Sequence, residues 1–269
     1  MYRCIIIVGV LFVLVTLACE ARGVPEEEIE EQNLSGHNFY FTDLQRRDLS
    51  GKILQEADFS YASLWSADLQ NADLRKADLN WTNLRDANLS GANLIGAKLE
   101  FASLKGANFE GAKLDEKWAK IIDLLTSGSG HGQDFSNFDL SRVAMSVIEY
   151  DLSKAKLRKA NLEEAYIPGI NLTKADLTSA KLNQAHLRGA NLTMANLTHA
   201  NLQDANLHSA NLQEANLTGA NLDGVKFTYA NLTGVQGIED YLLESDIEIK
   251  CAIMPNGVKR QLEIPISDN

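Results

Sequence analysis

Leucine or phenylalanine recurs at every fifth residue from Leu34 to Leu114, and the same interval resumes in a shifted register from Leu152 to Leu232. Ile167 is the single departure from these two residue types. A small residue, most often alanine, stands two positions before each apolar residue. An interval of five fits neither the 3.6-residue period of a helix nor the two-residue alternation of a strand. The chain must therefore turn once in every repeat.

Each repeat can form one side of a closed coil, with the leucine on the axis and the alanine at the adjoining corner. The Asn or Asp before the leucine suits a bend, because its side chain can hydrogen-bond to nearby backbone. Successive coils would pair through backbone hydrogen bonds, about 4.8 Å apart. The predicted structural core of the second block includes Leu192, Leu197, Leu202, Leu207 and Leu212.

The tandem motif Ala-(Asp/Asn)-Leu-x-x resembles the pentapeptide-repeat family over residues 32–116 and about 135–235. The resemblance implies an all-β fold, a right-handed, quadrilateral parallel β-helix (solenoid) with four repeats per coil. Each block would supply slightly more than four coils, and the whole tower would be about 40 Å long. Residues 20 apart should stack in polar ladders. Two such ladders are Asn171, Asn191, Asn211 and Asn231, and Thr178, Thr198 and Thr218.

Most of the net negative charge lies outside the two blocks. The chain has a net charge of −11, whereas residues 32–116 carry 12 acidic and 9 basic groups and residues 151–235 carry 7 and 8. A solenoid whose walls mimic the charge of a DNA duplex would show the opposite distribution. The sequence also has no basic stripe, so we expect no nucleic-acid partner.

The segment 1–19 resembles an export signal. Arg3 precedes an apolar run over residues 5–17, which is short for a transmembrane helix and about right for a signal-peptide core. Cys19 resembles the lipidated cysteine of a bacterial lipoprotein, although Thr16 stands where an aliphatic residue is usual. Three outcomes stay open: lipidation at Cys19, cleavage near Ala18 or Gly23, or an uncleaved anchor.

Export implies a bacterial periplasm, a membrane-anchored or extracellular position, or a thylakoid lumen. Residues 20–31 would form a short acidic tether between the membrane and the solenoid. The tail sequence from Cys251 to Gly257 looks like the Cys-x-x-Met-Pro-Asp-Gly tail of many cyanobacterial pentapeptide-repeat proteins, with Asn256 in place of Asp. We expect Cys251 to be a small buried residue of a C-terminal cap.

The first interruption, residues 117–134, predicts a helix followed by a flexible loop. Apolar residues at helical spacing form one stripe, and a connector rich in glycine and serine covers residues 128–132. The helix could pack where the two blocks meet, or the segment could protrude and bind a partner. The candidate interaction residues are Trp118, Ile122 and His131. Between Met145 and Leu152 the repeat shifts by two residues, which predicts a bulge or coil offset.

The second interruption, residues 236–269, predicts a C-terminal cap. It contains a short helix within residues 237–248, an alternating strand over 247–254 and a turn at 255–258. A solenoid exposes the apolar end of a coil, which such a segment would cover. The degenerate first repeats would form the corresponding N-terminal cap.

The sequence contains no recognisable catalytic motif and indicates no cofactor or metal site. It has no phosphate-binding glycine loop and no nucleophile elbow. His186 and His208 would lie on adjacent coils without a thiolate or paired carboxylate, which makes a poor metal site. The pattern favours a non-enzymatic, exported or membrane-tethered scaffold that binds an unknown protein partner through its solenoid faces. The alternatives are a DNA-mimic modulator of a type II topoisomerase and, less favoured, an enzyme.

Overall fold

A computed structural model of the chain describes residues 22–23, 29–127, 129–145, 150–239, 241 and 249–258. The predicted signal segment, with Cys19, lies outside these residues. Within the described residues, no helix has the length and apolar character needed to cross a membrane.

The repeats form four-sided coils, with one repeat on each side, as the sequence predicts. Isolated parallel bridges join residues 20 apart throughout the first block, and one column consists of Asn33, Ile53, Asp73, Asn93 and Lys113. Backbone hydrogen bonds of 2.7 to 3.2 Å connect the coils, such as the one from Leu54 N–H to Asp73 O at 2.8 Å. Each repeat therefore contributes one short side to a stack of paired coils.

The polar residue before each leucine shapes the following corner. Asn191 Oδ1 accepts the N–H of Thr193 at 3.1 Å, and the same contact recurs through most repeats. The second corner residue has a left-handed backbone, as at Glu56 with φ 58°. A hydrogen bond from Ala57 N–H to Leu54 O, at 3.2 Å, then closes that turn. This local bonding explains why Asn and Asp are frequent at that position.

The solenoid core consists of the repeated leucines and alanines. Leucine side chains fill the axis, and alanines such as Ala205 are equally buried at the corners. The side chains of the five representative leucines have no exposed surface: Leu192, Leu197, Leu202, Leu207 and Leu212.

Only some hydrogen bonds of the predicted polar ladders run from one coil to the next. Asn231 Nδ2 donates to Asn211 Oδ1 at 3.1 Å, which joins two adjacent coils. Asn211, however, donates to Thr193 Oγ1 at 3.0 Å and not to an identical residue. Thr198 Oγ1 donates to Asn196 within its own repeat, at 2.6 Å. The threonine hydroxyls that we expected to stack therefore also serve the local corner.

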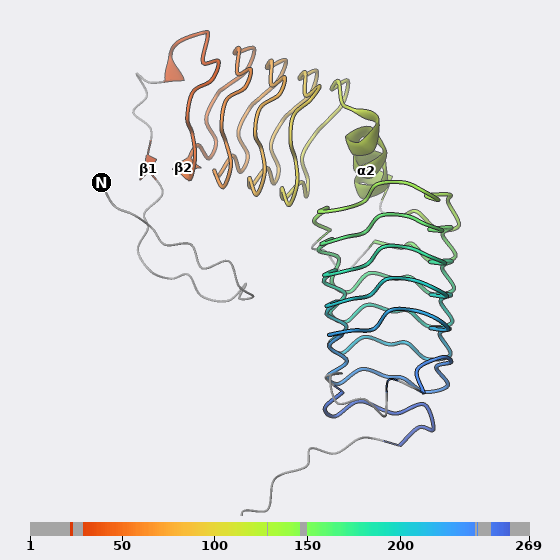
Figure 1. Ribbon diagram of the computed structural model, residues 1–269. Coiled ribbons are helices and arrows are strands. Elements are labelled where there is room, and N and C mark those ends of the chain that lie inside the picture. Colours follow the sequence, from red (N-terminus) through yellow and green to blue (C-terminus); the bar gives the residue numbers. More distant parts are fainter. Residues whose placement is uncertain are drawn as a thin grey trace, which may run out of the picture.

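The repeats form two stacks that are not coaxial, whereas we expected a single tower (Figure 1). The first stack comprises residues 29–114 and the second comprises residues 129–258, with the described gaps. Helix α2, Glu116–Ser127, lies between them. One backbone hydrogen bond, from Phe101 N–H to Arg142 O at 2.9 Å, also joins the two stacks directly.

The second stack begins earlier than expected. Ser129 already pairs with Asp151, so residues 129–133 form a regular repeat and not the flexible connector that their glycines suggested. Its first coil is longer than the following ones, because Ala144 pairs with Tyr166 whereas Asp151 pairs with Asn171. The additional residues fall between 144 and 151, where the sequence predicted an offset, and residues 146–149 lie outside the described part.

Helix α2 covers the open end of the second stack. Trp118, Ile121, Ile122 and Leu124 are buried in the same apolar core as the repeats. Around Gly130, the side chains of Leu124, Phe135 and Leu152 lie close together. The Lys120 ammonium adds a cation–π contact, 4.6 Å from the centroid of the Phe138 ring. The helix thus acts as an internal cap for a coil that would otherwise expose its axis.

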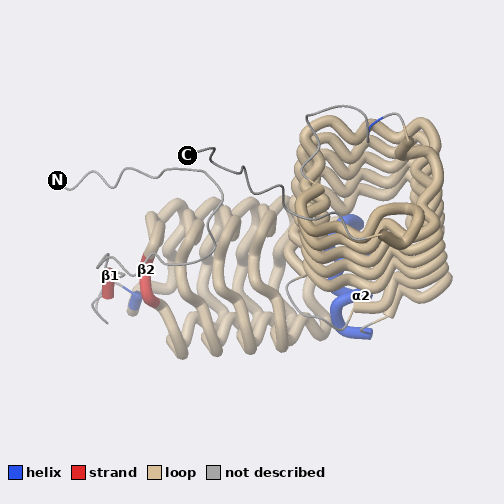
Figure 2. Tube along the Cα trace, turned by 90° about the horizontal axis from the view of Figure 1, so that it is seen from below, coloured by secondary structure: helices blue, strands red, loops and turns tan. Residues whose placement is uncertain are grey.

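The start of the first stack includes part of the expected acidic tether. Strand β1, Arg22–Gly23, pairs in parallel with β2, Thr42–Asp43, and both lie at the far end of the first stack (Figure 2). Ile29 is buried, and Lys52 Nζ donates to the carbonyl of Glu31 at 3.1 Å. Residues 22–23 and 29–31 therefore contact the first coils and do not form a free linker.

The described tail continues the second stack. Ile253 pairs with Asn231, and Cys251 has a left-handed φ of 57°, so residues 249–254 turn a corner where we expected an alternating strand. Gly257 N–H donates to Met254 O at 2.8 Å in the predicted turn. Cys251 is a free thiol and is partly exposed, which corrects its expected burial. The helix predicted within residues 237–248 lies mostly outside the described residues.

Candidate interaction surface

Two of the three candidate interaction residues of the insertion are inside the protein. Trp118 and Ile122 have exposed fractions of 5% and 6%. A partner could not contact them without displacing α2, so the interpretation of a protruding loop is wrong for these residues. The apolar stripe of the helix instead packs where the two blocks meet, which is the other of the two roles predicted from the sequence.

His131 is exposed, but its neighbours do not form a catalytic relay. Its Nδ1 atom lies 2.7 Å from Ser153 Oγ and 3.6 Å from Asp151 Oδ2. A serine-histidine-aspartate relay needs the serine and the carboxylate on opposite ring nitrogens. Here both face the same nitrogen, and Ser153 is buried. The arrangement therefore supports the coil and offers no activated nucleophile.

The described residues contain no group of three or more His, Cys, Asp or Glu side chains that could hold a metal ion. His186 lies beside Tyr166, with ring centroids 5.6 Å apart. Burial lowers the pKa of His186, and the charge of Lys226 acts in the same direction. Both effects favour the neutral imidazole.

A row of aromatic rings, most of them exposed, runs along one corner of the first stack. Tyr61 and Trp81 are stacked with centroids 5.8 Å apart and an interplanar angle of 3°, and Trp81 and Phe101 are stacked at 4.2 Å and 18°. Tyr40 meets Tyr61 edge-on at 5.7 Å. We call this row the aromatic ridge, and it comprises Tyr40, Phe41, Tyr61, Trp81 and Phe101.

The ridge occupies a corner position where large side chains are unfavourable. Tyr61 and Trp81 have φ values of 60° and 61°, in the left-handed region that bulky residues seldom adopt. Ring stacking offsets part of that cost, by about 0.5 to 1.5 kcal/mol for each pair. Trp81 nevertheless remains 38% exposed and Tyr61 42%. Stacking of the coils alone does not require aromatic residues here, because most corners of the second stack carry other residue types.

The five-residue pattern does not reveal this ridge. Within that pattern the two corner positions are variable and have no evident role. A 20-residue reading places residues 41, 61, 81 and 101 in one line, and all four are aromatic. The available signal was therefore a second period, four times the first.

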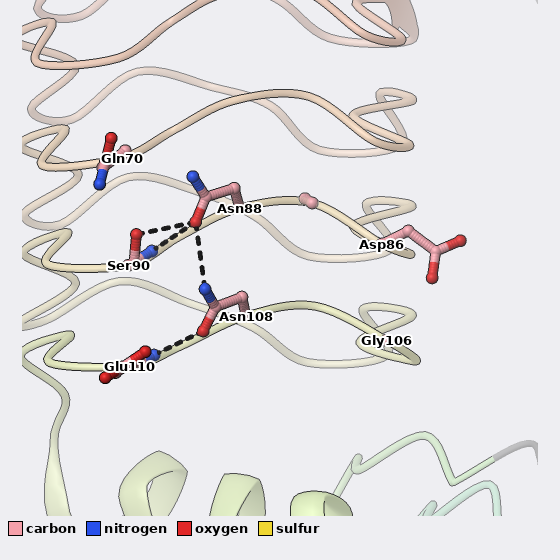
Figure 3. A pocket seen from close by; sticks show the side chains of 8 residues that line it. Gln70, Asp86, Asn88, Ser90, Gly106, Asn108 and Glu110 are labelled. Atoms are coloured by element: carbon pink, nitrogen blue, oxygen red, sulfur yellow. Dashed lines mark hydrogen bonds between the residues drawn. The ribbon is translucent and has the colours of Figure 1, made fainter.

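A shallow polar hollow lies near the last coil of the first stack (Figure 3). Asn88 Oδ1 accepts the N–H and the hydroxyl of Ser90, at 3.2 and 2.8 Å. Asn108 Nδ2 donates to the same oxygen at 3.4 Å, and Asn108 Oδ1 accepts the N–H of Glu110 at 3.0 Å. These amides already satisfy one another, and the hollow resembles an ordinary solenoid face more than a binding pocket.

The sequence profile of pentapeptide repeats matches residues 38–75, 53–91, 82–116, 151–178, 170–208 and 200–236. These segments overlap the two blocks of leucine-centred coils and together cover more than half of the chain. The chain belongs to the pentapeptide-repeat family.

Solved structures of similar pentapeptide-repeat proteins come from cyanobacteria and a plant. HetL, from the cyanobacterium Nostoc sp. strain PCC 7120 and involved in heterocyst differentiation regulation, is 32% identical over 85% of this chain and 87% of its own, with a TM-score of 0.28. An Arabidopsis thaliana thylakoid-lumen protein is 31% identical over 42% of this chain and 72% of its own, with a TM-score of 0.27.

A third, Rfr23 from the cyanobacterium Cyanothece 51142, is 26% identical over 50% of this chain and 92% of its own, with a TM-score of 0.28. No curated protein sequence is significantly similar to the chain. Because the TM-scores are low, membership of the family rests on the repeat sequence and not on a superposition of whole chains.

One ion pair on this pentapeptide-repeat protein gives a pH-dependent prediction. Arg75 donates to both carboxylate oxygens of Asp73, at 2.8 and 2.7 Å, and this bonding lowers the pKa of Asp73 to about 2 from its ordinary 3.8. The pKa of Asp73 is lower in the folded chain than in the unfolded chain. The ion pair therefore stabilises the fold above about pH 4, and this stabilisation is lost as the pH falls towards 2. The stabilisation should be small, because solvent screens an ion pair whose two side chains are both partly exposed.

We expect Arg75→Gln to return the pKa of Asp73 towards its ordinary value, as measured by NMR titration of side-chain carboxyl carbons. Gln55 Nε2 also donates to Asp73, at 2.7 Å, so part of the depression should persist. Arg142→Gln is the matched control, because Arg142 pairs with Glu164 in the second stack. An unchanged Asp73 titration in Arg75→Gln would contradict the assignment.

Proposed function

We propose that this pentapeptide-repeat protein is a non-enzymatic scaffold, exported or membrane-tethered, that binds a protein partner through its solenoid faces. The aromatic ridge is the observation that carries the proposal. Tyr, Trp and Phe are enriched in the centres of protein interfaces and among the residues that contribute most to binding. Exposed rings in a continuous row are therefore a surface that a partner can cover.

The rigidity of the ridge also favours docking. Its rings stack on one another, and the backbone beneath them is held by hydrogen bonds between coils, such as Tyr61 N–H to Asn80 O at 3.0 Å. Binding then immobilises few additional side-chain rotations, each of which would cost about 0.5 to 1.5 kcal/mol. A preformed apolar surface of this kind can bind a partner without a catalytic group.

Export is the second part of the proposal and rests on the sequence of the segment 1–19. The similar Arabidopsis protein comes from the thylakoid lumen, a location in keeping with export across a membrane. The described coils would then lie outside the cytoplasm, joined to a lipid at Cys19 or released by cleavage. Mass spectrometry of the mature N-terminus after membrane fractionation tests this part, and a full-length chain in the cytoplasm would refute it.

The surface charge of the first stack does not favour the DNA-mimic alternative. A mimic of a duplex needs continuous rows of carboxylates. The column Asn38, Asp58, Asp78, Lys98 changes sign along its length, and Lys98 pairs with Asp78 at 2.9 Å. Inhibition of a purified type II topoisomerase, measured as loss of supercoiling, would support the alternative.

Photo-crosslinking tests the docking proposal directly. We expect a benzophenone amino acid in place of Tyr61 to form an adduct with a protein from the native envelope fraction. The same group in place of Met194, which is 46% exposed on the second stack, is the position control. Failure of all exposed positions on both stacks to yield a protein adduct would argue against a scaffold.

A further inference from the structure

The aromatic ridge is one border of a single face of the first stack. The adjoining face carries the short polar column Asp43, Ser63, Asn83 and Ser103, whose members pair from coil to coil. We call this column the serine–asparagine face. It lies between the ridge corner and the next corner along the chain, so an extended segment centred on it has one border on each side.

The other border has a different chemistry. Arg46, Arg85 and Lys105 occupy the same corner on different coils, with Trp65 among them. All three cations are exposed, and none makes an ion pair with another residue of the described chain. We call the three cations and Trp65 the basic corner.

Trp65 gives the basic corner a fixed apolar element. The Arg46 guanidinium lies 4.9 Å from the centroid of its ring, and its indole N–H donates to Asp86 Oδ2 at 3.1 Å. On another corner of the same stack, by contrast, Lys76 pairs with Glu56 at 3.1 Å and Arg75 pairs with Asp73. Asp86 shares this corner but forms no ion pair with the three cations within the described chain, so they remain available for an external carboxylate.

We propose, on the basis of the scaffold function above, that the serine–asparagine face binds an extended acidic segment of a partner protein. Side chains of an extended strand point alternately to opposite sides. A segment that alternates apolar and acidic residues would place the apolar set on the aromatic ridge and the carboxylates on the basic corner. Three coil spacings separate residues 43 and 103, roughly 14 Å, which is the length of about four extended residues.

The geometry of the rings favours a peptide over a nucleic acid. Stacking with bases requires free ring faces, whereas Trp81 lies between Tyr61 and Phe101 and presents mainly its edges. The net charge of −11 also repels a long phosphate chain at a distance. A short segment with few carboxylates experiences less of this repulsion and still reaches the three local cations.

Binding of a defined peptide tests this inference. The probe is a fluorescein-labelled hexapeptide of alternating glutamate and leucine, added to the full-length protein and followed by fluorescence anisotropy. We expect saturable binding that weakens as salt is raised, and none of a lysine–leucine hexapeptide. Tryptophan emission should change as well, because Trp65 and Trp81 border the face whereas Trp118 is buried.

Matched variants locate the binding surface. Arg85→Glu should weaken the glutamate–leucine peptide about tenfold or more, because a repulsion replaces an attraction. Trp81→Ala should weaken it by a similar factor. Arg188→Glu and Tyr229→Ala change surface residues of the second stack and should leave the affinity unaltered. Unchanged thermal melts establish that each variant is folded.

Three outcomes would overturn the inference: no binding of the peptide, equal affinity for Arg85→Glu and the unmodified protein, or binding of a thymidine oligonucleotide or phosphatidylglycerol vesicles in its place. The scaffold function is judged separately, by protein adducts formed from Tyr61. If Arg85→Glu captures the same partner through Tyr61 with undiminished yield at a limiting partner concentration, the scaffold stands and the acidic-segment inference fails.

Discussion

Leu207→Ala is expected to lower the free energy of unfolding by about 2 to 5 kcal/mol. Leu207 has no exposed surface and lies in a central coil of the second stack, with Leu187 and Phe227 in the equivalent positions of the coils on either side. Coils above and below are rigidly paired and cannot collapse into the space left by the missing atoms. Urea denaturation followed by circular dichroism measures the loss.

Met194→Ala provides the matched comparison for the core substitution. Met194 belongs to the same stack but is 46% exposed, so its truncation should change stability by less than about 0.5 kcal/mol. A Leu207→Ala variant as stable as Met194→Ala would mean that the leucines do not fill the axis. A solenoid unfolds through coupled neighbouring units, so both variants should be compared over the whole transition.

The coil was predictable because its determinants are local. The leucine and alanine positions set the inside of each repeat, and the Asn or Asp side chain bonds to the backbone two residues later, as Asn191 does to Thr193. These contacts lie within one repeat or between equivalent repeats of adjacent coils, about 20 residues apart. A five-residue pattern therefore contains nearly all the information needed for one side of a coil.

The angle between the stacks was not predictable, because it depends on packing between distant segments. Helix α2 orients the second stack through Leu124 near Gly130, Phe135 and Leu152. The apolar stripe of α2 indicated that the helix packs against another surface, but it did not indicate which surface. The same stripe supported the incorrect interpretation of Trp118 as an interaction residue, since exposure cannot be read from helical periodicity alone.

The candidate surface was hidden for a related reason. The ridge can be recognised in the sequence only when the coil length is known, because the coil length decides which variable residues become neighbours. The greater length of the first coil of the second stack shows how sensitive this alignment is. The ridge ends at Phe101 because residue 121, the next position in the line, lies in α2 and not in a coil.

Gly237→Ala is expected to open the last coils of the second stack. Gly237 has φ +77°, and an added Cβ would lie 2.5 Å from both the Cα and the backbone N of Thr218. The left-handed conformation costs a residue with a side chain about 1 to 2 kcal/mol, and displacing the backbone adds about 1 to 3 kcal/mol. Because the contact is with backbone, no rotation of a neighbouring side chain can relieve it.

Gly189→Ala separates the two contributions. Gly189 has a similar φ of +69°, but an added Cβ would meet nothing within 4 Å, so only the conformational cost should remain. Because Gly237 is near the end of the stack, its effect should appear as local opening before global unfolding. Hydrogen exchange should accelerate at the amides of Leu217 and Gln236, which bond across the last coils. Equal exchange at these amides in the two alanine variants would mean that the close approach at Thr218 contributes nothing to holding the end of the solenoid.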